Sequence, residues 1–362
     1  MRQISAPQVW PSIIKGAQRE APRIVAKDVS PYVPFLAELG DGGFLALETS
    51  GLAAVPGRLV RRDAALEPVA VLPNLQTAAA LSPNRRWLLA GGPCLEAEVA
   101  AAVLVDVAEW RAVRTLPLRP PFVWLDDQRF IAQTPRFRYE TQNGCMVPTT
   151  RLVDPALVAT AAHLLDIVPG LVLVDRTTLE ARLLLPSESF RGEDACALSA
   201  DGSILFSTTN FARTSAVRIE DGSLVFQHPA SRLIFEGTVH ALACNAARSE
   251  IVTVGTGADP VRVLDATTGA YKLRWDPLQP CVRAGLRAPK LLGALAVHAD
   301  GRVAIGSNIG VLLEVAPDGQ RITACKAATR AIQALAYARH SGALIIGGNE
   351  RNLRVLPSDG AN

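Results

Sequence analysis

Cysteine and histidine are the side chains best suited to ligate a metal or to act as a nucleophile or base. The cysteines of this chain are Cys94, Cys145, Cys196, Cys244, Cys281 and Cys325, and its histidines are His163, His228, His240, His298 and His340. No two cysteines have the close spacing of a zinc site. We therefore expect no metal, no cofactor and no catalytic residue. A site assembled from distant segments remains an alternative.

Sequence motifs also point away from an enzyme. The chain has no P-loop, no HExxH, no nucleophile elbow and no EF-hand loop. The stretch from Gly255 to Pro260 begins like a dinucleotide-binding loop, but Pro260 falls where a helix should start. We interpret it as a turn between two strands. Cys196 and Cys244 flank equivalent apolar strands, and we interpret them as small packing residues.

Three segments carry side chains that suit recognition of a partner. The first is Arg136, Phe137, Arg138 and Tyr139, because alternating Arg and aromatic residues are typical of interface hot spots. An ordinary edge strand is the alternative. The second is the connection from Pro277 to Pro289, with Arg283, Arg287 and the following Lys290, or else simply a solvated loop. The third is the stretch from Leu95 to Val99, which alternates acidic and apolar residues and otherwise fits a hairpin tip.

Composition limits the class of partner. The chain has 49% hydrophobic and 20% charged residues and a formal net charge of +3. So small a charge does not favour nucleic acid, which selects a basic stripe. No run approaches the ~18 apolar residues of a membrane span. The start of the chain, Met1 to Gly16, lacks the apolar stretch of a secretory signal. We expect a cytoplasmic protein with reduced thiols, from a GC-rich bacterial genome.

The elements that position these residues are set by an internal repeat. A small-Leu-small triplet is followed by a polar turn and an apolar run, at Leu81, Leu198, Leu242, Leu295 and Leu335. Weaker copies surround Leu36 and Trp124. Each copy fits a hairpin, and a second hairpin follows most copies, so one repeat makes a four-stranded unit. A period near ~40–45 residues of four strands predicts a β-propeller.

The rhythm of the repeat resembles the WD40 and YVTN-type propellers over residues 33–358. Asp106, Asp175 and Asp265 stand where the Asp of the family's Trp-Asp pair would fall. The chain has no Gly-His before its first strands and no Trp-Asp, so we do not expect the family's hydrogen-bonded tetrad. The resemblance implies an all-β fold with a single β-propeller.

The repeat divides the chain into two parts. Residues 1–32 form an N-terminal segment and residues 33–362 the propeller. The predicted blades span 33–73, 77–118, 121–186, 194–229, 238–276, 291–326 and 331–358. The last blade has only three strands, so we expect an N-terminal strand to complete it, either at Gln8-Val9-Trp10 or at Arg23-Ile24-Val25-Ala26.

The third blade contains an insertion at about residues 134–170. In one interpretation Asp154-Pro155 begins a short helix with Leu157, Ala161, Leu164 and Leu165 on one face. In the other, residues 151–154 pair with residues 157–159, which would give eight blades. We favour seven.

The expected function is a non-catalytic scaffold or sensor subunit of a multiprotein complex. The resemblance implies protein partners such as ATPase, protease or kinase complexes. One alternative is a metal-dependent lactonase or hydrolase of the propeller type. A second is a propeller that binds nucleic acid. Because the insertion departs most from the repeat, we expect Arg136, Phe137, Arg138 and Tyr139 to contact the partner.

Overall fold

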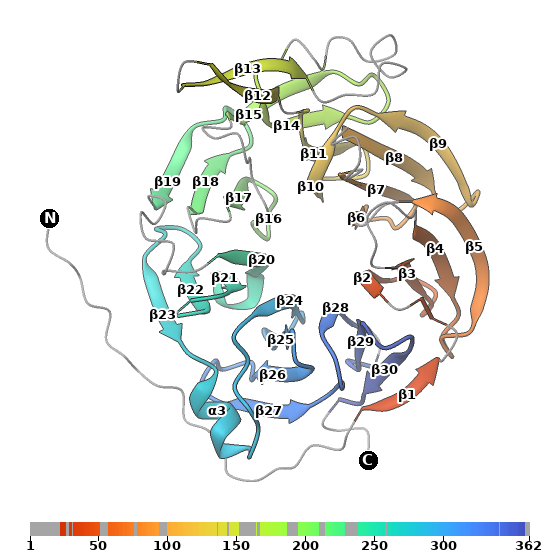
Figure 1. Cartoon of the computed structure of the whole chain (residues 1–362), viewed down its shortest axis with the longest axis vertical. Helices are drawn as coiled ribbons and strands as arrows, with labels where there is room; N and C mark the ends of the chain where they lie inside the picture. Colours follow the sequence, from red (N-terminus) through yellow and green to blue (C-terminus); the bar gives the residue numbers. More distant parts are fainter. Residues whose placement is uncertain are drawn as a thin grey trace, which may run out of the picture.

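A computed structural model describes residues 22–26, 29–30, 32–50, 57–75, 78–93, 100–135, 137–142, 145–151, 164, 167–186, 195–209, 214–228, 238–257, 259–339 and 341–358. These residues form seven four-stranded antiparallel sheets and one two-stranded sheet. The seven larger sheets are arranged as blades around a central axis (Figure 1). The predicted seven-bladed propeller is confirmed, and the eight-bladed alternative is wrong.

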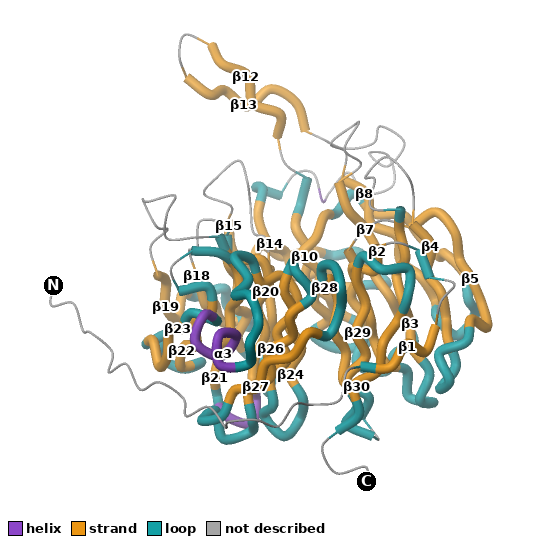
Figure 2. The backbone as a smooth tube through the Cα atoms, turned by 60° about the horizontal axis from the view of Figure 1, so that its bottom comes forward, coloured by secondary structure: helices purple, strands orange, loops and turns teal. Residues whose placement is uncertain are grey.

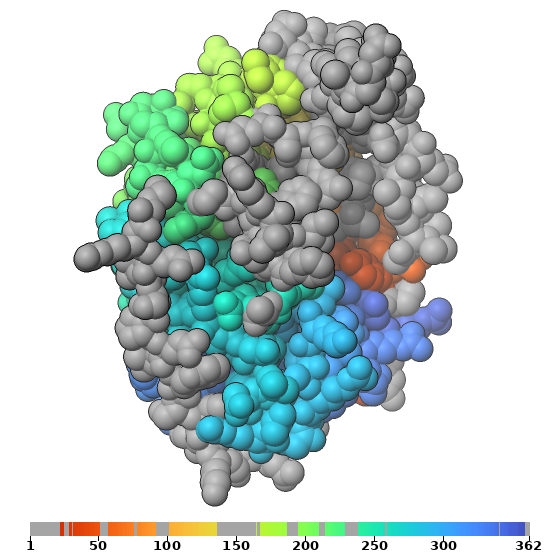
Figure 3. Space-filling view, turned by 60° about the vertical axis from the view of Figure 1, so that its left-hand side comes forward, coloured from red at the N-terminus to blue at the C-terminus, as the bar shows by residue number. Residues whose placement is uncertain are grey.

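Within each of blades 1 to 6, the strands follow one another from the axis outwards. Blade 1 consists of β2 (Tyr32–Glu38), β3 (Phe44–Thr49), β4 (Gly57–Arg62) and β5 (Pro68–Leu75). Blade 2 consists of β6 (Ala78–Leu81), β7 (Trp87–Pro93), β8 (Ala100–Asp106) and β9 (Arg111–Leu116). Blade 3 consists of β10 (Arg119–Trp124), β11 (Arg129–Gln133), β14 (Gly170–Asp175) and β15 (Ala181–Pro186). Blade 4 consists of β16 (Ala195–Leu198), β17 (Ile204–Thr208), β18 (Thr214–Arg218) and β19 (Leu224–His228). Blade 5 consists of β20 (Val239–Asn245), β21 (Glu250–Gly255), β22 (Val261–Asp265) and β23 (Tyr271–Trp275). Blade 6 consists of β24 (Leu292–Val297), β25 (Val303–Ser307), β26 (Val311–Val315) and β27 (Ile322–Lys326). In the space-filling view, the green, cyan and blue surfaces of blades 4 to 7 follow one another in sequence order (Figure 3).

Blade 7 joins the two ends of the chain. It consists of β28 (Ile332–Tyr337), β29 (Leu344–Gly348), β30 (Leu353–Leu356) and, as its outer strand, β1 (Arg23–Ala26). Strand β1 runs antiparallel to β30, with Arg23 opposite Val355 and Ala26 opposite Leu353. The predicted closure by an N-terminal strand is therefore confirmed, and Arg23–Ala26 is the segment that provides it. Pairing β30 in this way removes an edge that could otherwise pair with another chain.

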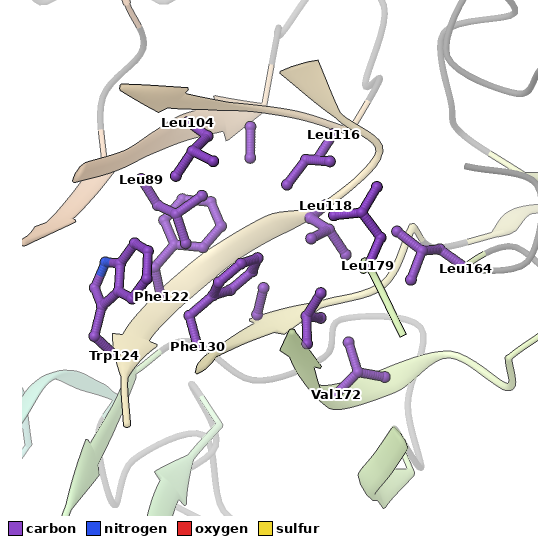
Figure 4. Close-up of a cluster of buried hydrophobic side chains, with 13 residues drawn as sticks. Leu89, Leu104, Leu116, Leu118, Phe122, Trp124, Phe130, Leu164, Val172 and Leu179 are labelled. Atoms are coloured by element: carbon purple, nitrogen blue, oxygen red, sulfur yellow. The ribbon is translucent and has the colours of Figure 1, made fainter. Parts of the chain in front are cut away.

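The hydrophobic core is divided among the junctions between blades. Each of seven buried apolar clusters draws its residues from two neighbouring blades. Between blades 2 and 3, Leu89 and Leu104 pack against Phe122 and Phe130 (Figure 4). Because both faces of a blade are covered, its strands are apolar on both sides: all six residues of β3 are buried.

Polar side chains add links across the junctions. The indole nitrogen of Trp124 in blade 3 donates to the carbonyl of Ala80 in blade 2 at 3.0 Å. Between blades 7 and 1, the backbone N–H of Arg339 donates to Glu38 at 3.0 Å. These bonds fix the register of one blade against the next, in addition to the apolar packing.

Asp106, Asp175 and Asp265 end the third strands of blades 2, 3 and 5. Each carboxylate accepts hydrogen bonds from two backbone N–H groups of the turn that follows, as Asp265 does from Thr267 at 3.0 Å and Thr268 at 2.9 Å. The Thr268 N–H is the largest influence on Asp265 and, with Lys272, lowers its pKa to about 2. These carboxylates therefore close turns, and the three Asp residues occupy equivalent positions in their blades, as the repeat predicts.

The insertion in blade 3 contains the two-stranded sheet, formed by β12 (Phe137–Gln142) and β13 (Cys145–Arg151). Residues 152–163, 165 and 166 lie outside the described residues, and with them most of the predicted helix and most of the alternative strand pair. Leu164 is fully buried in the core between blades 2 and 3. In the described part of the chain, no helix is long and apolar enough to cross a membrane.

Candidate partner-binding site

The alternation of strand direction gives the ring two different faces. One carries the connections between second and third strands and those between blades; we call it the long-loop face. The other carries the turns between first and second and between third and fourth strands; we call it the short-turn face. The insertion after β11 and the connection from β23 to β24 both belong to the long-loop face. Connections with room for insertions are where binding residues most often reside.

The hairpin formed by β12 and β13 stands away from the seven blades (Figure 2). Its strands are antiparallel, with Phe137 opposite Arg151 and Gln142 opposite Cys145, and an irregularity lies between Phe137 and Tyr139. Among the described residues, neither strand pairs with any strand other than its hairpin partner. Within the described part of the chain, both outer edges of the hairpin are therefore unpaired, and such edges are templates for pairing with another chain.

The base of the insertion is fixed to blade 3. Thr134 is fully buried, and its backbone N–H donates to the carbonyl of Gly170 at 3.0 Å. In return, the N–H of Gly170 donates to the Thr134 hydroxyl at 2.9 Å. A Cβ at Gly170 would lie 2.3 Å from the carbonyl oxygen of Leu185, so only glycine fits this approach. The insertion thus begins and ends at the bonded pair of Thr134 and Gly170 in blade 3.

Three of the four predicted recognition residues lie on this hairpin. Phe137, Arg138 and Tyr139 are the first residues of β12. Arg136 lies outside the described residues. The alternative, an ordinary edge strand, also stays open, because both strands of a two-stranded sheet are edge strands. Which of its side chains contact a partner stays a prediction.

The second predicted segment, Pro277 to Pro289, contains a short helix that the sequence analysis did not foresee. This helix, α3 (Leu278–Arg283), lies beside β27 at the rim of the ring (Figure 1). Asp276 accepts a hydrogen bond from the N–H of Leu278 at 2.8 Å, so the Asp276-Pro277 pair was the available signal for a helix start. Cys281 is fully buried, whereas Arg283, Arg287 and Lys290 are exposed.

Sequence analysis missed the residues that meet this connection in space. Gly285, Leu286 and Arg287 line a cavity of 560 Å³ together with Lys326, Thr329, Arg330 and Asn349. These residues come from three separate connections of blades 5, 6 and 7. No spacing rule could have grouped them, because the ring alone brings them together. The third predicted segment, Leu95 to Val99, lies outside the described residues.

The described histidines are dispersed over the ring. His228, His240 and His298 belong to blades 4, 5 and 6, and they contact Gly269, Thr238 and Asp300 respectively. Among the described residues, no group of three His, Cys, Asp or Glu side chains could hold a metal ion. The segment Gly255 to Pro260 is a turn between β21 and β22, as predicted, with the Gly255 N–H donating to Pro260 at 2.9 Å.

Cys196 and Cys244 lie on the innermost strands of blades 4 and 5 as free thiols. Both are half-buried rather than fully enclosed. Burial is the main influence on Cys244 and raises the pKa of its thiol. A raised pKa keeps the sulfur protonated and poorly nucleophilic at neutral pH, which agrees with the predicted packing role.

We compared the chain with known proteins. No family model matches the sequence, and no curated protein matches it either. The architecture itself accommodates both binding proteins and enzymes, since function depends on sites added to a fold. The long-loop face and its β12–β13 hairpin are therefore the features from which a function can be inferred.

Proposed function

We propose that this protein is a non-catalytic scaffold or sensor subunit that binds other proteins through its long-loop face. We also propose that the chain is a degenerate relative of the WD40 and YVTN-type propellers and that it is a cytoplasmic, bacterial protein. Its proposed partners belong to an ATPase, protease or kinase complex. The hairpin of β12 and β13 is the proposed main contact, with Arg136, Phe137, Arg138 and Tyr139 as its anchors.

The observation that carries this proposal is the projection of the hairpin from the ring. Every other described strand belongs to a four-stranded blade whose faces pack on its neighbours. An isolated two-stranded hairpin is only marginally stable in water, so its own strand pairing gives it little stability. A partner that adds a strand or covers its aromatic residues would supply what the ring does not.

The residue types of the segment fit a protein partner. Tyr and Arg are enriched among the few residues that dominate binding energy at protein interfaces. Two of the residues, Phe137 and Tyr139, contribute large apolar area, and both arginines can form bidentate bonds to carboxylates. The projecting hairpin would present this set at a distance from the blades, where a large partner can reach it.

The test compares two sets of alanine substitutions in a tagged chain expressed in its native cell. We expect Arg136→Ala, Phe137→Ala, Arg138→Ala and Tyr139→Ala together to reduce partner recovery about tenfold or more, a loss of about 1.4 kcal/mol. The matched control is Arg111→Ala, Val113→Ala and Arg114→Ala on β9, whose side chains are all exposed. The control should leave recovery unchanged.

Thermal unfolding of both variants separates binding from folding. The proposal requires that the β12 variant keep the melting temperature of the parent while losing its partner. A β12 variant that retains its partner at full stability would contradict the proposal. So would a loss of partner that follows only the fraction of unfolded protein, since that result would give these residues a packing role.

A further inference from the structure

A second site lies on the long-loop face where blades 6 and 7 meet. The cavity of 560 Å³ is lined by three cations, Arg287, Lys326 and Arg330. No carboxylate lies among its described lining residues. A neighbouring cavity of 480 Å³ shares Thr329, Arg330 and Asn349 with it and adds Glu350, Arg351 and Arg354. We call the two cavities together the basic groove.

The groove concentrates positive charge. Its five basic side chains face one carboxylate, Glu350, so their excess is larger than the +3 formal charge of the whole chain. Glu350 is already engaged, because both its oxygens accept hydrogen bonds from within the protein. Arg354 is its ion-pair partner at 2.6 Å. Among the described residues, no carboxylate lies within ion-pair distance of Arg287, Arg330 or Arg351, and all three side chains are exposed.

The connection from β27 to β28, which carries Thr329 and Arg330 of the groove, is held by backbone bonds. The carbonyl of Gly310 accepts from the N–H groups of Ala327 and Ala328, each at 3.0 Å. A Cβ at Gly310 would lie 2.0 Å from the carbonyl oxygen of Ala328, so a larger residue would force this connection apart. Glu350 then accepts from the N–H of Arg330 at 2.7 Å and from Thr329.

This arrangement fixes the backbone at Arg330 before any ligand arrives. Burial opposes ionisation of Glu350, but the bonds from Thr329, Arg330 and Arg354 outweigh it and hold the pKa of Glu350 below its usual value. The carboxylate therefore stays charged at neutral pH and keeps the connection in place. A connection whose backbone is already ordered costs less to engage than one that must become ordered on binding.

The groove also contains an unsatisfied polar atom. The side-chain oxygen of Asn349 is buried without a hydrogen-bond partner, and Asn349 lines both cavities. An occupant can therefore find both cationic side chains and an amide acceptor in the groove.

We infer that this groove binds an acidic segment of a partner protein, in extended form. The excess of cations without an ion-pair partner selects carboxylates, and the two cavities together place five basic side chains where several acidic side chains can meet them. Single-stranded nucleic acid is the other polyanion of this shape, but it binds through aromatic side chains that stack on the bases. No aromatic residue is among the described residues that line either cavity.

The test measures binding of a labelled peptide in which Glu alternates with Ala, by fluorescence anisotropy. Its Gln counterpart and a labelled oligo-dT are the comparison probes. We expect Arg287→Glu with Arg330→Glu to weaken binding of the Glu peptide at least about tenfold, and added salt to weaken it further. The matched control is Arg111→Glu with Arg114→Glu on β9, which changes the net charge equally at exposed positions. It should change affinity by less than about twofold.

Three outcomes would overturn the inference. They are equal weakening by both double variants, equal binding of the Gln peptide, or tighter binding of oligo-dT. A single Arg287→Glu variant gives the same comparison if the double variant is destabilised. The inference is independent of the hairpin: a failure here leaves partner recovery through β12 unaffected, and a hairpin without a partner leaves the peptide measurement intact.

Discussion

Blade 1 contains a buried ion pair. Arg62 of β4 pairs with Glu48 of β3, with 2.6 Å between Nη2 and Oε1. Both side chains are almost completely buried, at 1% and 0% exposed. Arg62 also donates to the carbonyl of Leu66, and Arg58 pairs with the second oxygen of Glu48 at 2.9 Å. This network links β3, β4 and the turn that follows β4 within blade 1.

Removing the arginine would leave Glu48 with too few partners in a dry environment. We expect Arg62→Ala to lower the free energy of unfolding by about 3–5 kcal/mol, because breaking a buried pair strands the remaining charge. The adjacent Arg61→Ala is the matched control, since Arg61 pairs with Asp41 at 2.8 Å on an exposed surface. Its cost should stay below about 1 kcal/mol. Urea unfolding measures both; equal losses would show that burial does not govern this pair.

At the scale of elements, ring closure can be tested directly by deleting the strand that closes the ring. Deleting residues 1–30 removes β1, which leaves β30 as an unpaired outer strand and exposes the apolar side of blade 7. We expect aggregation or a large fall in melting temperature. Deleting residues 1–20 retains β1 and should leave the melting temperature unchanged. Light scattering and thermal unfolding report both; a stable monomer without β1 would contradict closure by this strand.

Much of the element order was predictable from the sequence. Repeated small-Leu-small triplets and Asp-Gly turns placed all seven blades, because each blade must bury its strands in the same way. The closing strand was less certain, since Gln8–Trp10 and Arg23–Ala26 are both short and partly apolar. Only the pairing of Arg23 with Val355 decides between them.

The elements outside the repeat were harder to predict. Strand β13 contains Pro148, which argues against a strand inside a blade. The sequence analysis did not predict the pairing of β12 with β13, and the helix or strand pair that it expected farther along lies mostly outside the described residues. The basic groove could not be predicted at all, because Arg287, Lys326, Arg330 and Asn349 meet only when blades 5, 6 and 7 are assembled.

At the scale of the whole molecule, the two faces of the ring differ in what they offer a partner. On the short-turn face, Asp106, Asp175 and Asp265 use their carboxylates to close turns. The long-loop face carries the projecting hairpin, α3 and the basic groove. We therefore propose that recognition of partners is concentrated on the long-loop face.

Amide hydrogen exchange of the full chain, with and without its recovered partner, tests that claim most directly. Exchange slows where a partner covers or orders the backbone. The account predicts slower exchange in residues 137–142, 145–151 and 326–331, with no change in the turns at 106–110 and 265–270. Slower exchange confined to those turns, or none in the hairpin, would contradict it.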